Sequence, residues 1–121
     1  MGVRSMAVAA ALVALASSAQ AQQNIEAKFW FKENPNNISG CISADSSFTR
    51  VHTFTLVNGQ AELKSAGGID VKLKPVRPNV YQGNFYLGRM NLIYTADFTQ
   101  TPPRLDAQTK EGGCKWSAVK E

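Results

Sequence analysis

Two side chains that could take part in chemistry lie close together in a stretch whose pattern otherwise predicts a buried strand face. Every second residue from position 48 to 56 reads Phe48, Arg50, His52, Phe54 and Leu56. Because successive side chains of a strand point to opposite faces, Arg50 and His52 share their face with apolar neighbours. Burying a charge without a partner is costly. These two groups must therefore reach either solvent or an anionic partner.

Two interpretations of Arg50 and His52 follow. In the first, the strand extends past its hairpin partner, and both groups reach solvent at a rim of the domain. In the second, they form the polar end of a site for a small anionic ligand. A guanidinium can hold a carboxylate or phosphate through two parallel hydrogen bonds, and a histidine titrates near neutrality. The apolar part of such a ligand would then lie against Phe54, Phe85 and Leu92.

The sequence offers little for catalysis. His52 is the only histidine, so a Ser-His-Asp or Cys-His arrangement would have to use it. No Gly-x-Ser-x-Gly element, phosphate loop or two-histidine metal motif occurs. Asp45, Asp70, Asp97 and Asp106 are well separated and sit beside turn or strand-end residues, which is typical of solvated or turn-capping carboxylates. We expect no enzymatic activity, no cofactor and no metal; a hydrolase that uses His52 is the alternative.

Cys41 and Cys114 are the only cysteines. An even number of cysteines in an exported chain predicts a disulfide, and two distant cysteines with one histidine lack the paired spacing of a zinc site. A disulfide would close the long loop between Cys41 and Cys114, and this would stabilise the fold by about 4 kcal/mol in the chain-entropy model. Cys41 also follows Ile-Ser-Gly, as in a lipid-attachment site. Such a cysteine must come directly behind the apolar part of a leader, and Cys41 does not, so we expect no lipid on it.

The first residues predict export. Arg4 supplies positive charge, residues 6–16 form an apolar run, and residues 19–21 read Ala-Gln-Ala. That order is typical of a cleaved secretory signal peptide, and the run is too short to span a bilayer. We expect a signal peptide at residues 1–21, a single all-β domain at residues 22–121, no membrane span, and a secreted or periplasmic location.

Alternating apolar residues predict the first strands and their register. Residues 25–31 alternate, and residues 48–57 follow as a long strand that ends at Asn58-Gly59, a strong signal for a two-residue hairpin turn. A two-residue turn at Gly67-Gly68 would put the apolar faces of the next two strands on opposite sides, since a shift of one residue exchanges faces. A three-residue loop at residues 66–68 restores the match, and we expect that loop.

The second half of the chain continues the pattern. Pro75 and Pro78 are expected to interrupt it, after which residues 80–87 pair with 90–98 around Gly88-Arg89. That register puts Gly83 opposite Tyr94, where a glycine in a strand suggests a bend or a close approach. The final hairpin is expected to pair residues 104–109 with 114–119. A further short strand is expected at residues 38–43.

Together these signals predict an all-β fold of eight to nine short strands in mostly up-and-down order, as a small antiparallel barrel or a two-sheet sandwich with one disulfide. A barrel is favoured because closure removes exposed edges. The formal net charge of +4 has both signs scattered along the chain, which argues against a nucleic-acid partner. We expect a monomeric, non-enzymatic binding or interaction protein for a small ligand or an envelope protein. A carrier of a small anionic amphiphile is an alternative.

Overall fold

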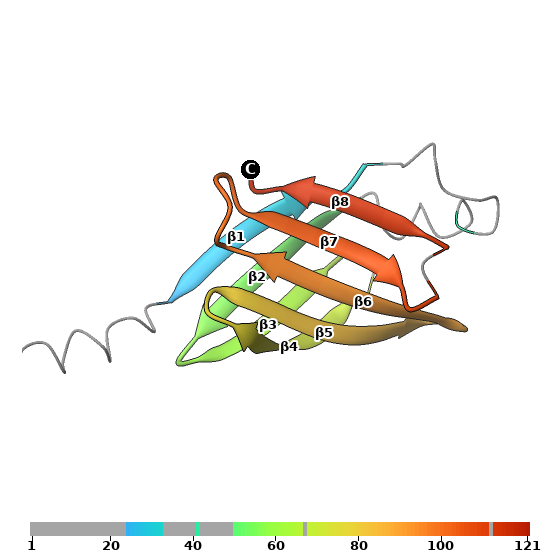
Figure 1. Ribbon diagram of the computed structural model, residues 1–121, viewed down its shortest axis with the longest axis horizontal. Helices are drawn as coiled ribbons and strands as arrows, with labels where there is room; N and C mark the ends of the chain where they lie inside the picture. The colour runs from blue at the N-terminus through green and yellow to red at the C-terminus, as the bar shows by residue number, and fades with distance from the viewer. Residues whose placement is uncertain (1–23, 33–40, 42–49, 67, 112) are drawn as a thin grey trace, which may run out of the picture.

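The computed structural model describes residues 24–32, 41, 50–66, 68–111 and 113–121. These residues form one antiparallel sheet in which each strand pairs with the next along the chain (Figure 1). The strands are β1 (Ile25–Trp30), β2 (Val51–Val57), β3 (Gln60–Ser65), β4 (Asp70–Arg77), β5 (Val80–Leu87), β6 (Met90–Asp97), β7 (Arg104–Thr109) and β8 (Lys115–Val119). The predicted all-β, up-and-down order is confirmed.

The sheet curls into a nearly closed barrel, because its first and last strands meet. Phe29 of β1 forms a bridge with Lys120, just after β8, and the Glu121 N–H donates to the Lys28 carbonyl at 3.0 Å. Strands β5 to β8 cross in front of β1 to β4 in Figure 1, so the sheet packs on itself. Of the two expected architectures, the barrel is the one observed.

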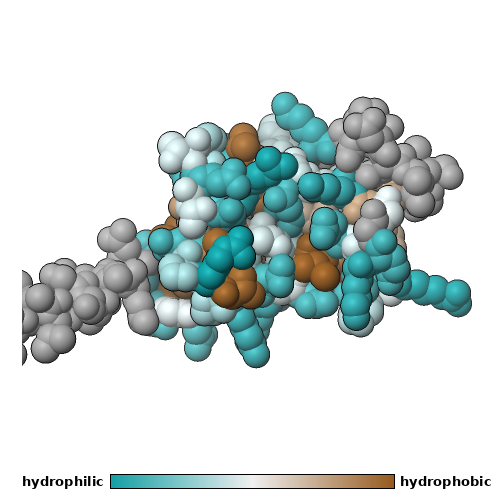
Figure 2. Space-filling view, in the orientation of Figure 1, coloured by the Kyte–Doolittle hydropathy of each residue, from teal (hydrophilic) through white to brown (hydrophobic). Residues whose placement is uncertain are grey.

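The barrel interior is filled by side chains from alternate strand positions. At one end the rings of Phe54 and Phe98 lie 4.7 Å apart, and Tyr81 lies 5.4 Å from Phe54. The largest fully buried side chains are Trp116, Tyr94, Phe29, Phe31, Phe54, Leu63, Ile69, Leu92, Leu105, His52 and Val71. The outer face seen in Figure 2 is mostly hydrophilic, with hydrophobic residues exposed in small separate patches. This division of the two faces is the expected result of period-two alternation.

The predicted hairpin registers are confirmed. Asn58 and Gly59 have φ values of 52° and 80°, as a type I′ turn requires, and Leu56 pairs with Ala61 across it. Leu63 pairs with Val71, so the loop at residues 66–68 has three residues as expected. The later hairpins pair Leu87 with Met90 and Leu105 with Ala118, also as expected.

The expectation that the chain breaks at Pro75 is wrong. β4 continues through Pro75 to Arg77, with a register shift between these residues. A proline lacks the N–H of a regular ladder but is tolerated at a bulge. The chain reverses instead at Pro78-Asn79, where Asn79 has a φ of 62°. Proline followed by a residue with positive φ is the pattern of a type II turn.

Gly83 marks a corner of the barrel. It lies opposite Tyr94 in the β5–β6 ladder, as expected. A β-carbon added there would lie 2.5 Å from the Lys72 carbonyl oxygen and 2.7 Å from Leu73 Cδ2. The glycine therefore allows β5 to approach β4 closely, next to the paired residues Lys74 and Gln82.

Several expectations concern residues beyond the described part of the chain. The signal peptide at residues 1–21 lies there, and so does the strand expected at residues 38–43, apart from Cys41. β2 begins at Val51 rather than at Phe48, which also falls outside the described residues. Within the described ranges, no helix is long and apolar enough to cross a bilayer.

Candidate functional site

The two residues that the sequence singled out, Arg50 and His52, occupy different environments. Arg50 is exposed, whereas His52 is fully buried inside the barrel. The His52 ring meets Phe31 edge to face at 4.9 Å and lies 6.0 Å from the ring of Tyr94. The interpretation that both groups reach solvent therefore holds for Arg50 alone. Whether they bind a ligand stays a prediction.

The hydrogen bond of His52 shows which ring nitrogen carries a proton. Its Nδ1 lies 3.1 Å from the Arg50 carbonyl oxygen, and since a carbonyl can only accept, Nδ1 carries the proton and donates it. Burial lowers the pKa of His52 below its ordinary value, an effect that the Arg50 carbonyl partly offsets. Burial likewise raises the pKa of Tyr94. Both rings are therefore neutral at pH 7. A side chain that acts as a catalytic base must also be able to reach its substrate.

The predicted disulfide is confirmed. Cys41 and Cys114 are joined, with their Cα atoms 5.8 Å apart, and the bridge ties Cys41 to the residue before β8. The turn at Cys114 is also held by Thr109, whose hydroxyl accepts from the Cys114 N–H at 3.0 Å. A buried disulfide of this kind is structural, and it suggests a non-reducing environment.

A groove opens on the outer surface where β1 meets β8. We call it the seam groove; it has a volume of about 550 Å³ and is lined by Trp30, Lys32, Arg104 and residues 117–121. Trp30 and Val119 leave 54% and 56% of their surface exposed there. Large aromatic side chains are usually more deeply buried, so the position of Trp30 needs an explanation that packing does not supply.

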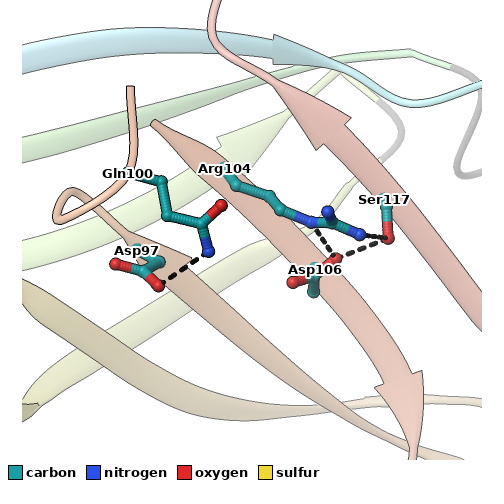
Figure 3. Close-up of polar contacts among 5 residues, drawn as sticks. All are labelled: Asp97, Gln100, Arg104, Asp106 and Ser117. Atoms are coloured by element: carbon teal, nitrogen blue, oxygen red, sulfur yellow. Dashed lines mark hydrogen bonds and ion pairs between the residues drawn. The ribbon is translucent and has the colours of Figure 1, made fainter. Parts of the chain in front are cut away.

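Arg104 is fixed in the seam groove by two neighbours (Figure 3). Its Nε donates to Asp106 Oδ1 at 3.0 Å, and its Nη2 donates to Ser117 Oγ at 3.1 Å. Ser117 in turn donates to the same Asp106 oxygen. These three side chains lie on the outer faces of β7 and β8, where the antiparallel ladder pairs Asp106 with Ser117. The guanidinium is therefore held in one orientation before any ligand arrives.

The charges of the seam groove are mainly positive. Lys32, Arg104 and Lys120 line it together with one carboxylate, that of Glu121. Among the described residues, the ion pairs are Lys64–Glu62 and Arg104–Asp106, so neither groove lysine has an ion-pair partner within that part of the chain. An anion that entered the groove would meet two ammonium groups that form no ion pair with a described carboxylate.

Among the described acidic residues, Asp97 behaves as a turn carboxylate, whereas Asp45 lies outside the described part of the chain. Asp97 accepts a hydrogen bond from the Thr99 N–H at 2.9 Å. It also accepts one from the Gln100 side chain at 3.1 Å (Figure 3). Hydrogen bonds from Thr99 are the main reason that the pKa of Asp97 is lowered. Across the described residues, no three His, Cys, Asp or Glu side chains gather as metal ligands would.

A second hollow of about 390 Å³ lies at the end of the barrel that carries the Asn58-Gly59 and Pro78-Asn79 turns. It is lined by Leu56, Val76 and Tyr81, with Arg77 beside them. It is smaller than the seam groove, and it has one lining cation instead of three. The seam groove is therefore the better candidate for a ligand site.

Sequence reasoning missed the seam groove, although one signal was present. Trp30 falls on the outward face of the first strand between Lys28 and Lys32, where a large apolar residue breaks the polar pattern. Val119 interrupts the outward face of β8 in the same way. Their meeting across the seam depends on barrel closure, which the sequence does not reveal.

Comparison with known proteins adds no relative. The chain matches no protein-family model, no curated protein and no solved structure.

Proposed function

We propose that this protein is a non-enzymatic binding protein of the periplasm or extracellular space, and that the seam groove is its ligand site. The observation that carries the proposal is a groove of about 550 Å³ in which the exposed ring of Trp30 lies among three cations. Ligand sites are typically hollows of roughly 300 to 1,000 Å³ that combine apolar walls with a few polar groups. The seam groove has this size and composition.

The contents of the barrel support a site on its outside. Phe54 and Leu92, which would line an interior site beneath Arg50 and His52, are fully buried and packed in the core. A ligand in their place would have to displace well-packed aromatic and aliphatic side chains, and interiors are close-packed. Entry to the seam groove requires no such displacement.

The proposed location rests on two features. The Cys41–Cys114 disulfide favours an oxidising compartment, and residues 1–21 have the order of charge, apolar run and small residues of a cleaved leader. A hydrolase that uses His52 is the weaker alternative, because the ring is buried against Phe31 and Tyr94 and would have to be uncovered for each turnover.

The proposal is tested by mass spectrometry of the protein purified from its host under native conditions. Wild type is expected to retain a ligand that denaturation releases, and Trp30→Ala is expected to lose it. Tyr86→Ala is the matched control, since Tyr86 is 67% exposed on β5 and does not line the groove. A ligand retained equally by Trp30→Ala and wild type would mean that binding occurs elsewhere.

A further inference from the structure

The guanidinium of Arg104 has one edge engaged and one edge that the described contacts leave open. A guanidinium offers two parallel donor pairs: Nε with Nη2 along its side, and Nη1 with Nη2 at its end. Asp106 and Ser117 bind through Nε and Nη2, which is the side edge, and Nη1 takes part in neither bond (Figure 3). The end edge can therefore still hold a carboxylate or a phosphate through two parallel hydrogen bonds.

We infer that the seam groove binds a small anionic amphiphile, with its carboxylate or phosphate on the end edge of Arg104 and its apolar body against Trp30 and Val119. This inference rests on the proposed function and names the ligand class. The head group and the apolar body are both needed, because the groove places a fixed cation beside two exposed apolar side chains.

Preorganisation makes Arg104 the anchor of this site. A long side chain usually loses rotamer freedom when it binds a ligand, but Asp106 and Ser117 already hold this one. Asp106 and Ser117 are thus positioning residues. Asp106 also lowers the net positive charge, so the attraction for the anion depends on donor geometry as well as on charge.

Lys32 and Lys120 complete the charge pattern. They line the same groove as Arg104, and among the described residues no carboxylate lies at ion-pair distance from either. Exposed ammonium groups are flexible point charges, so they favour an anion without fixing its orientation. Their contribution is screened by salt, over a Debye length of about 10 Å at 0.1 M.

The apolar side of the groove limits the ligand to one that has an apolar body. Trp30 supplies a flat ring and Val119 a branched aliphatic group, and both are more than half exposed. Covering them with an alkyl chain or an aromatic ring removes apolar surface from water, which favours binding. An inorganic anion would leave this surface exposed, so we expect phosphate alone to bind much more weakly.

Isothermal titration calorimetry of the mature protein with three single-chain probes below their micelle concentrations tests the inference. The probes are decanoate, decyl phosphate and, as a neutral match, decyl glucoside. Both anions are expected to bind saturably and at least about tenfold more tightly than the glucoside, and raising salt is expected to weaken only the anions. Inorganic phosphate is expected to give no saturable heat in the same range.

Variants assign the binding to Arg104. Arg104→Gln is expected to weaken both anions by about tenfold or more and to leave the glucoside unchanged. Arg104→Lys keeps the charge but not the paired donors and is expected not to restore wild-type affinity. Lys64→Gln is the matched control, because it removes one exposed positive charge on β3 that is outside the groove. Lys120→Gln is a second groove variant, which changes an exposed side chain and is expected to fold like wild type and to weaken binding of both anions.

The outcomes separate this inference from the proposed function. Equal affinity for the anions and the glucoside would overturn the inference, and so would an anion affinity that a folded Arg104→Gln variant leaves unchanged, whatever the effect of Lys120→Gln. If the natively purified protein still carried a ligand that Trp30→Ala loses, the proposed function would survive that result. Binding to vesicles of phosphatidylglycerol without binding to single-chain probes would also overturn the inference, in favour of a membrane surface.

Discussion

Acidification is expected to destabilise the barrel through His52. The ring is buried, and its pKa is lowered in the folded state, mainly by burial. Below the unfolded pKa of about 6.5, the unfolded chain therefore binds a proton that the folded chain does not. The buried, neutral ring of His52 therefore costs no stability above that pH, and the free energy of unfolding falls as the pH drops below it.

The size of the effect follows from linkage. For each pH unit below about 6.5 over which the folded ring stays neutral, the free energy of unfolding falls by about 1.4 kcal/mol. Between pH 7.5 and pH 5.5 that value is the upper limit of the loss. No other histidine titrates in this range, because His52 is the only one, and Tyr94 stays neutral because its pKa is raised.

The assay is denaturant unfolding at several pH values from 7.5 to 5.5, with wild type and His52→Leu compared. Leucine fills a similar volume without a titrating group, so its free energy of unfolding should change little over this range. Staying above pH 5.5 avoids most of the titration of carboxylates such as Asp97. The reasoning is refuted if wild type and His52→Leu lose stability equally, or if wild type becomes more stable as the pH falls.

Three further predictions concern the fold. Gly83→Ala is expected to lower the free energy of unfolding by about 1 to 3 kcal/mol, because its β-carbon would meet the Lys72 carbonyl oxygen at 2.5 Å; unchanged thermal stability would contradict the close approach. Replacing Cys41 and Cys114 by serine is expected to cost about 4 kcal/mol in chemical denaturation, and a loss near zero would mean that the bridge adds little. Asn58→Ala is expected to cost about 1 kcal/mol, since Asn58 has a φ of 52°, whereas Asn58→Gly should be neutral or better.

The hairpins could be predicted from the sequence because local chemistry determines them. Asn58-Gly59 and Gly88-Arg89 define their turns, and the alternation of apolar residues on each side admits only one register. The three-residue loop before Ile69 followed from the same argument. Pro75 was misjudged because a bulge lets a strand tolerate a proline, and nothing local in the sequence predicts a bulge there.

The candidate site could not be predicted in the same way, because it is built from contacts between distant segments. The burial of His52 depends on Phe31, which comes just after β1, and on Tyr94 of β6. The seam groove depends on how β1 meets the end of β8, which brings Trp30 to Val119 and Lys120. Barrel stagger is a property of the whole sheet, so single-strand patterns do not contain it.

The central claim is that ligands bind in the seam groove, and the two indole N–H signals in a nuclear magnetic resonance spectrum test it most directly. Trp30 lines the groove, whereas Trp116 is fully buried in the core. During a decanoate titration, the Trp30 signal is expected to shift along a saturating curve while the Trp116 signal stays in place. A Trp116 signal that moves while Trp30 does not would contradict the account, because it would locate binding inside the barrel.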